Sequence, residues 1–263
     1  MFSLKNQIAK EKKRLINYHL SLKKKQNNTT PKPLTKTNKM IYVSIDIETS
    51  GLDHTKHSVL SIGAIIEDTE KKLPFLKCPR FNAIILQNEI TGSPRAIDMN
   101  SSIIGSMGRY LEASKEDREK LELAESCVYG GGYEFWEKDE VVKAFYCFLW
   151  NNGFSTLDSP SIHMDGKLKP VIDGRTKPIT INVAGKNFGT FDKLFLQELP
   201  WWQKLVRTRQ RVLDPAILCV DWKNDKSLPS LTQCKEKLGI DGIVTHNALD
   251  DAWDVIEILR KFY

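Results

Sequence analysis

The chain has 263 residues, of which 41% are hydrophobic and 27% charged, as expected for one globular α/β domain with insertions or a tail. No apolar run is long enough to span a bilayer, and the first residues lack the apolar core of a secretory signal. We therefore expect an intracellular, cytoplasmic protein without membrane contact. Five cysteines, an odd number without a C-x-x-C pair, argue against a disulfide framework or a zinc site.

The net charge of +6 is unevenly distributed along the chain. Residues 1–39 carry eleven basic side chains and one acidic side chain, a charge of +10, which leaves −4 for residues 40–263. This composition predicts a basic, flexible N-terminal arm. The arm could attract nucleic acid through counterion release, or it could be a solubilising tail or a targeting segment.

The first predicted strand alternates apolar and polar residues from Ile41 to Glu48, the period of two that a β-strand requires. Asp46 and Glu48 therefore point the same way. Like charges this close are usually tolerated when a cation or a shared proton offsets their repulsion, and hard carboxylate oxygens favour Mg²⁺ or Mn²⁺. Taken alone, the pair is explained more simply by a solvated edge strand.

Further elements follow from the apolar pattern. Strands are predicted at 59–66, 81–86 and 179–184, and a short strand and turn at 211–218. A core helix is predicted at 141–150, and an amphipathic helix at 228–238 that ends at Gly239. The short connections between the first three strands predict an antiparallel meander.

A helix predicted over about 188–199 carries the second informative carboxylate. Asp192 is spaced from Phe188, Phe195 and Leu196 so that all four residues share one face. A carboxylate on an apolar face needs a partner.

The last predicted helix follows Asn247, a suitable N-cap. Asp251 shares its face with apolar residues, whereas the opposite face is expected to be solvated through Asp250, Asp254, Glu257 and Lys261. His246 lies in the loop just before this helix. A lone histidine in such a place is more often structural, but beside these carboxylates it suits a general base at neutral pH.

Four carboxylates that face the core cannot all be ionised without cations, and two divalent ions would balance their charge, as in two-metal phosphoryl chemistry. In chain order, three motifs resemble those of the DEDDh (DnaQ-like) 3′→5′ exonucleases of the ribonuclease H-like superfamily. They are Asp46-Ile47-Glu48-Thr49-Ser50-Gly51-Leu52, Asn187-Phe188-Gly189-Thr190-Phe191-Asp192 and His246-Asn247-Ala248-Leu249-Asp250-Asp251.

The resemblance implies an α/β ribonuclease H-like fold, a five-stranded mixed sheet with helices on both faces, over residues 40–263 with insertions within about 101–178. It implies that Asp46 bridges two Mg²⁺ ions, for which Mn²⁺ could substitute. Glu48 and Asp251 would help to hold the ion that activates water, and Asp192 would bind near the second. His246 would be the general base.

The resemblance also implies contacts of Thr49, Gly51 and Leu52 with the terminal nucleotide, and Asn187 is a further candidate for substrate binding. Lys186 stands where many members have histidine, which bears on substrate choice. The implied reaction releases nucleoside 5′-monophosphates from single-stranded DNA or RNA 3′ ends, with DNA slightly favoured. The enzyme would act alone, or as a subunit that works in trans with a polymerase or another repair or processing protein. The alternatives are an RNA-trimming or oligoribonuclease-like enzyme and a non-catalytic nucleic-acid-binding module.

Overall fold

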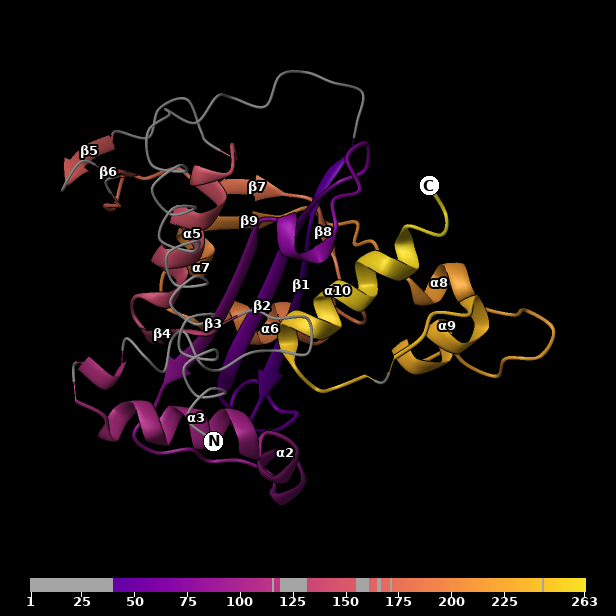
Figure 1. Cartoon of the computed structure of the whole chain (residues 1–263), viewed down its shortest axis with the longest axis horizontal. Coiled ribbons are helices and arrows are strands. Elements are labelled where there is room, and N and C mark those ends of the chain that lie inside the picture. Colours follow the sequence, from indigo (N-terminus) through magenta and orange to yellow (C-terminus); the bar gives the residue numbers. More distant parts are fainter. Residues whose placement is uncertain are drawn as a thin grey trace, which may run out of the picture.

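The computed structural model describes residues 40–114, 116–118, 132–154, 161–164, 167–170, 172–242 and 244–263, so the basic arm lies outside the described residues. Its central sheet has five strands in the order β4-β3-β2-β1-β8 (Figure 1). Their bounds are β1 Ile41–Thr49, β2 Val59–Asp68, β3 Arg80–Leu86, β4 Glu134–Glu137 and β8 Val183–Ala184. β1, β2 and β3 form an antiparallel meander, while β8 and β4 run parallel to β1 and β3. The predicted meander and the five-stranded mixed sheet are confirmed.

Two smaller sheets accompany the central one: β5 Ser161–Met164 with β6 Lys167–Pro170, and β7 Ile179–Ile181 with β9 Val206–Thr208. β7 and β8 together form the strand predicted at 179–184. Of the short strand and turn predicted at 211–218, the turn is confirmed but the strand is wrong, because this segment makes a single bridge at Leu213 and then enters helix α8, Ala216–Cys219. Asp214 turns the chain there by accepting a hydrogen bond from the Ala216 N–H at 2.9 Å. β4 is the fifth strand instead.

Helices cover both faces of the sheet, as predicted. One face packs against α5 Val141–Asn151, α6 Asp192–Gln197 and α7 Trp202–Leu205. The other packs against α8, α9 Leu231–Leu238 and α10 Ala248–Leu259, and towards β3 against α3 Ser101–Glu112. The helix α2 Pro94–Met99 and the short 3-10 helix η1 Phe75–Lys77 complete the described helices.

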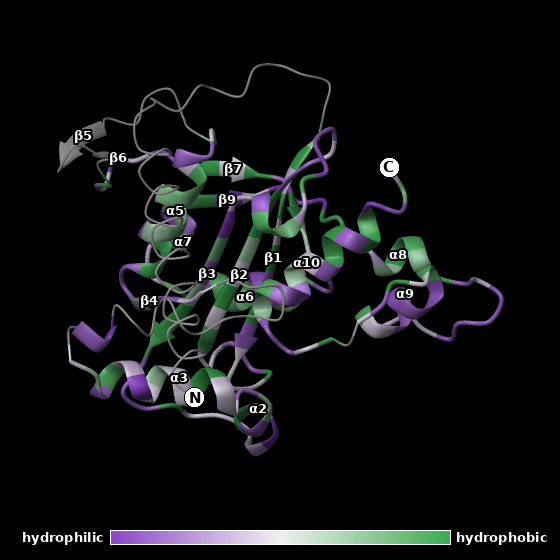
Figure 2. Cartoon of the chain, viewed as in Figure 1, coloured by the Kyte–Doolittle hydropathy of each residue, from purple (hydrophilic) through white to green (hydrophobic). Residues whose placement is uncertain are grey.

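The alternation of β1 separates these two faces. Val43, Ile45 and Ile47 join the core with α5 to α7, whereas Tyr42 joins the core with α10. Hydrophobic residues accordingly concentrate along the strands of the sheet, and hydrophilic residues along the outer loops (Figure 2). Asp46 and Glu48 share the face of Tyr42, so the strand directs both carboxylates towards the α10 layer.

A glycine brings α10 close to these carboxylates. Gly63 of β2 lies opposite Asp46 in the β1–β2 register. A Cβ atom at Gly63 would lie 2.2 Å from the Ala248 carbonyl carbon and from the Leu249 nitrogen. The first turn of α10 therefore rests directly on the strand beside Asp46, an approach that only glycine permits.

No helix among the described residues is long and apolar enough to cross a membrane. Among the described residues, Cys78, Cys219 and Cys234 are free thiols.

Candidate active site

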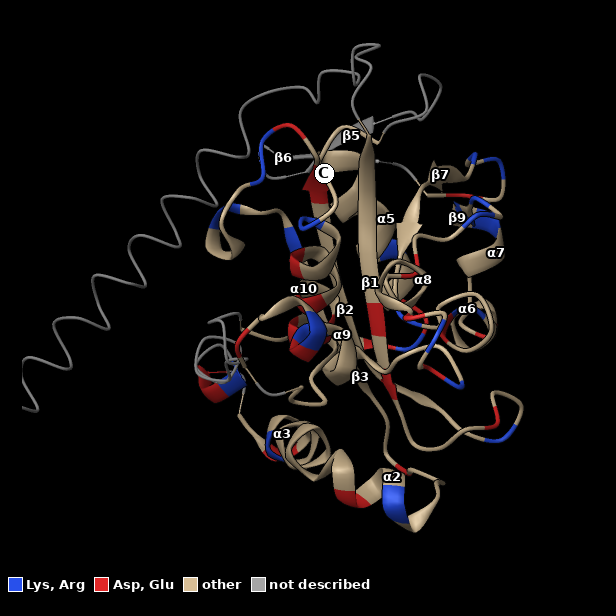
Figure 3. Cartoon of the chain, turned by 90° about the vertical axis from the view of Figure 1, so that its right-hand side faces the viewer, with Lys and Arg blue, Asp and Glu red and all other residues tan. Residues whose placement is uncertain are grey.

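Three carboxylates from two elements meet at one end of β1. Asp46, Glu48 and Asp251 each offer an oxygen atom, and these atoms lie within 4.8 Å of one another. Figure 3 shows acidic positions on β1 beside α10. Asp251 comes from the first turn of α10 and is only 8% exposed, so the predicted inward orientation of this side chain is confirmed. We call these three residues the acidic triad.

Asp192 lies next to the acidic triad without belonging to it. Its side chain is buried, and Oδ1 accepts a hydrogen bond from the Ile47 N–H at 3.2 Å. This N–H is available because β8 pairs with β1 only at Val43 and Ser44. The predicted burial of Asp192 is confirmed, but its position in mid-helix is wrong: α6 begins at Asp192. The preceding turn delays the helix, with Asn187 in a left-handed conformation at φ 63°.

The four carboxylates perturb one another. Burial, and then the nearby charges of Asp192, Asp251 and Glu48, raise the pKa of Asp46 well above its ordinary value. Burial likewise raises the pKa of Glu48 to about 7 and that of Asp192 to about 7. Burial, with Glu48, Asp254 and Asp250, raises the pKa of Asp251 to about 8. Among the described residues, Lys235 opposes one of these shifts by lowering the pKa of Asp251, and no cation opposes the other three.

The acidic triad fits a divalent cation. Among the described residues, no lysine or arginine forms an ion pair with any of the three. Asp251 Oδ1 is buried and has no hydrogen-bond partner in the described part of the chain. A buried carboxylate oxygen without a donor is costly, and a cation would satisfy it. Hard oxygen ligands in this arrangement suit Mg²⁺ or Mn²⁺.

His246 stands just outside this cluster. It is exposed, precedes α10 directly, and adopts a left-handed backbone conformation with φ 53°. No hydrogen bond holds its imidazole within the described residues. The predicted N-cap is confirmed, since Asn247 Oδ1 accepts from the N–H groups of Leu249 at 3.1 Å and Asp250 at 3.3 Å.

The predicted substrate residues differ in how accessible they are. Thr49 is buried, and its hydroxyl donates to the Gly51 carbonyl at 2.8 Å. Gly51 is buried against the ring of His57, which a Cβ atom there would approach to 2.6 Å. Leu52 is 84% exposed, and Asn187 is also exposed. Leu52 and Asn187 are therefore open to a ligand, whereas Thr49 and Gly51 shape the turn that presents Leu52.

Asn100, at the junction of α2 and α3, has a role that was not predicted from the sequence. Its amide donates to the Thr49 carbonyl at 3.2 Å, and its hydrogen bond to Glu48 lowers the pKa of that carboxyl against the effect of burial. Asn100 thus supports the end of β1 that carries Glu48. No periodicity marks it, because it lies between two helices.

The predicted solvated face of α10 is wrong for Asp250 and Asp254. Asp250 and Asp254 are each only 2% exposed, and Asp254 accepts from the buried Lys235 of α9 at 2.6 Å. The reason is that α9 covers this side of the helix. A signal existed, since Lys235 is four residues after Leu231 and three before Leu238, on the apolar stripe of α9.

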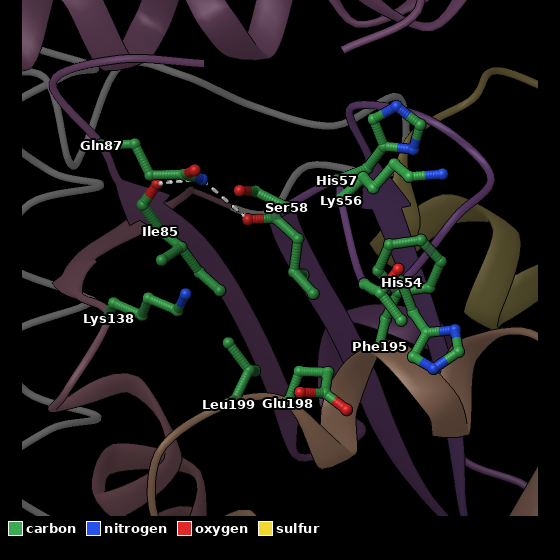
Figure 4. A pocket seen from close by; sticks show the side chains of 12 residues that line it. His54, Lys56, His57, Ser58, Ile85, Gln87, Lys138, Phe195, Glu198 and Leu199 are labelled. Atoms are coloured by element: carbon green, nitrogen blue, oxygen red, sulfur yellow. Dashed lines mark hydrogen bonds between the residues drawn. The ribbon is translucent and has the colours of Figure 1, made fainter. Parts of the chain in front are cut away.

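An open pocket of about 280 Å³ lies beside the site, between the β1–β2 loop, the ends of β2 and β3, and α6. In Figure 4, Lys138 lies on one side of it and His54 and His57 on the other, with Phe195 and Glu198 from the α6 region. The acidic triad does not line this pocket. The pocket takes Phe195 from α6, the helix that begins at Asp192, so the two features are linked through α6 but are not one cavity.

No protein-family model and no curated protein sequence matches this chain. Solved structures with a similar arrangement include Escherichia coli Exonuclease I in complex with a dT13 oligonucleotide, at 15% identity and a TM-score of 0.45, covering 84% of this chain and 40% of that one. Another is Exonuclease I from Methylocaldum szegediense, at 16% identity and a TM-score of 0.46, covering 84% and 39%. This chain thus spans about two fifths of those proteins.

A further similar structure is the nuclease domain of 3′hExo bound to rAMP, at 12% identity and a TM-score of 0.46, covering 87% of this chain and 94% of that domain. That domain is described as a DEDDh family member, the family that the three sequence motifs resemble.

Proposed function

We propose that this protein is a divalent-metal-dependent 3′→5′ exonuclease that acts on single-stranded nucleic acid. One observation carries the proposal: oxygens of Asp46, Glu48 and Asp251 converge within 4.8 Å, with Asp192 held beside them and no basic side chain of the described residues paired to the three. Four carboxylates arranged for cations suit displacement at phosphorus, where metal ions stabilise the attacking and leaving oxygens.

Each residue has a role in this proposal. The acidic triad would hold one cation, with Asp46 also facing a second that Asp192 would hold. When bound, the cations supply positive charge that polarises the phosphodiester and offsets the repulsion among the carboxylates. His246, exposed at the start of α10, would accept the proton of the attacking water. Asn100 would keep Glu48 in place.

In this proposal, the 3′ end of the nucleic acid lies over the β1–β2 turn. Leu52 presents an apolar side chain that is 84% exposed, which suits contact with the terminal base. Because Thr49 and Gly51 are buried, their contribution would come from the backbone of the turn and not from their side chains. Asn187 follows β8 and is exposed. It would contact the nucleic acid from the side of Asp192.

Digestion of 5′-labelled single-stranded DNA and of the matching RNA tests this function. Each polymer is incubated with Mg²⁺, with Mn²⁺ and with EDTA, and product lengths are resolved over time. We expect a metal-dependent ladder that shortens from the 3′ end and releases nucleoside 5′-monophosphates. The faster polymer identifies the substrate class.

Two variants make the result specific. Asp192→Asn is expected to abolish the ladder while the far-ultraviolet circular dichroism stays unchanged, because the amide oxygen still accepts from Ile47 but the charge is lost. His246→Ala is expected to lower the rate at neutral pH by about 10²- to 10⁴-fold. Absence of cleavage by folded, metal-loaded wild-type protein, together with measurable binding of either polymer, would favour the non-catalytic binding module.

The intracellular location and a polymerase or repair partner in trans stay predictions, because no contact of the described residues bears on them. The assignment of residues 1–39 as a separate arm also stays a prediction.

A further inference from the structure

The backbone of His246 is in the left-handed region, with φ 53°. This region is unfavourable for a residue with a Cβ atom, although histidine enters it more readily than most residues. Such conformations persist where surrounding contacts hold the chain. The hydrogen bonds of the two residues that flank His246 are among these contacts, and they help to hold the backbone that carries its imidazole.

Most of these hydrogen bonds are local to α10. Thr245 Oγ1 donates to Asp250 Oδ2 at 3.1 Å, and the Asn247 carbonyl accepts from the Asp251 N–H at 2.9 Å. Asn247 Oδ1 accepts from the N–H groups of Leu249 and Asp250. All of these partners lie in the first turn of the helix. They fix the loop to α10 but not to the strand that carries Asp46 and Glu48.

One contact reaches a different part of the molecule. Asn247 Nδ2 donates to the hydroxyl of Tyr133 at 2.5 Å, across a sequence separation of 114 residues. Tyr133 lies immediately before β4, is 7% exposed, and packs in a core cluster with Leu60 of β2 and Ile84 of β3. Among the hydrogen bonds of the described residues 244–247, this one alone ties the loop to the core of the sheet.

We propose that Tyr133 is a positioning residue for His246. Its hydroxyl fixes Asn247, and Asn247 fixes the backbone of His246 relative to the carboxylates on β1. A general base must lie within hydrogen-bond reach of the proton that it accepts, and a displacement of about 1 Å can cost up to about 10²-fold in rate. This inference rests on the proposed function, in which His246 is the base.

Tyr133→Phe tests the inference because it removes the hydroxyl and keeps the ring in its core cluster. With the better polymer and saturating Mg²⁺, we expect kcat to fall roughly three- to ten-fold, the factor that one net hydrogen bond represents, with KM unchanged. In the His246→Ala background, the same substitution should have no further effect, because the base that it positions is absent. Non-additivity in this double-mutant cycle is a result that general destabilisation would not produce.

The matched control is Tyr146→Phe. Tyr146 is also buried, and its hydroxyl donates to the Lys177 carbonyl at 3.3 Å, on the opposite face of the sheet. This variant should leave kcat unchanged. Equal slowing of wild type and His246→Ala by Tyr133→Phe would overturn the inference, and so would a wild-type kcat for Tyr133→Phe.

Amide hydrogen exchange separates this inference from the proposed function. In Tyr133→Phe without substrate, the N–H groups of residues 244–249 should exchange faster, while those of Tyr146→Phe stay at the wild-type rate. If the wild-type protein has no nuclease activity, the proposed function fails and the exchange rates decide whether Tyr133 orders the loop. Unchanged exchange of residues 244–249 would overturn the positioning role in that case.

Discussion

The two ends of α10 hold buried carboxylates in opposite ways. Near its middle and at its C-terminal end, each buried acid meets a protein cation: Asp254 pairs with Lys235 at 2.6 Å, and Glu67 of β2 receives two hydrogen bonds from Arg260 at 2.8 and 2.6 Å. At the N-terminal end, Asp251 meets Asp46 and Glu48, and no ion pair to these three occurs in the part of the chain that the structure describes. The positions of Asp251 and Asp254 are less than one helical turn apart.

This difference separates the carboxylates that serve stability from those to which we assign a role in the proposed function. A buried charge without a partner is expensive, and the fold supplies Lys235 and Arg260 where the charge serves stability. The acidic triad has no such cation paired to it among the described residues. Lys235 lowers the pKa of Asp251, but burial and the neighbouring carboxylates raise it more. Strongly perturbed carboxyls gathered in this way mark candidate functional sites.

The largest expected effect separates Asp251 from Asp254. Asp251→Asn should lower the exonuclease rate by about 10³-fold or more, since it removes a charged oxygen from the cation site. In EDTA its free energy of unfolding should equal or exceed that of wild type, because a charge without a protein partner is lost. Rates at saturating Mg²⁺ and urea unfolding in EDTA measure the two quantities.

Asp254→Asn is the matched control, isosteric and on the same helix. It should lose stability, because Lys235 then lacks its carboxylate, and keep its rate within about ten-fold. Near-normal turnover by Asp251→Asn would show that the acidic triad has no catalytic role.

The next largest effect is a loss of stability, expected when the buried ion pair between Lys235 and Asp254 is broken. Lys235→Met should lower the free energy of unfolding by about 3–5 kcal/mol, because it leaves the Asp254 carboxylate buried and unpaired. The double variant Lys235→Met/Asp254→Leu should recover most of this loss, since replacing both partners removes the buried charge. Urea unfolding at neutral pH measures all three proteins. A single variant as stable as wild type would mean that the pair does not compensate a buried charge.

The free energy of unfolding, measured over a series of pH values, tests the carboxylates at the N-terminal end of α10. The pKa values of Glu48, Asp192 and Asp251 rise from ordinary values of about 4 to about 7, 7 and 8 in the metal-free fold. The folded state therefore binds more protons than the unfolded state between these limits, so the free energy of unfolding should fall as pH rises from 5 to 8. A fall on the order of a few kcal/mol is expected, since one pKa unit corresponds to about 1.4 kcal/mol and the groups are coupled.

Divalent metal should reverse this pH dependence. Because the cation binds the ionised carboxylates, stabilisation by Mg²⁺ should grow with pH and reach about 2.7 kcal/mol at one hundred times its Kd. Thermal or urea unfolding with Mg²⁺ and with EDTA at each pH provides the measurement. The same slope in both series would exclude a cation site among these carboxylates.

Local periodicity in the sequence predicted part of this site. Alternation in β1 placed Asp46 and Glu48 on one face, and helical spacing turned Asp251 inward. It misplaced Asp250 and Asp254, because periodicity locates a residue relative to its own apolar stripe and does not reveal that a second helix, α9, covers the other side. The pairing of Lys235 with Asp254 depends on that second layer.

Other features depended on contacts between distant segments. Asn100 reaches β1 from the α2–α3 junction, and Tyr133 reaches Asn247 from the start of β4. Neither residue carries a pattern that would distinguish it from other loop residues. The close approach of α10 over Gly63 likewise follows from the β1–β2 register, which places this glycine opposite Asp46.

The smallest effect is expected at the C-terminal end of α10. Arg260→Lys should lower the free energy of unfolding by about 1–2 kcal/mol, because a lysine cannot make both hydrogen bonds to Glu67 and the third to the Leu73 carbonyl. The rate of the proposed exonuclease reaction should not change, because Glu67 and residue 260 lie outside the acidic triad. Lys261→Ala, an exposed neighbour, should stay within about 0.5 kcal/mol of wild type. A lower rate in Arg260→Lys at unchanged metal affinity would show that the two ends of α10 are coupled, because the helix would then transmit a change at Glu67 to Asp251.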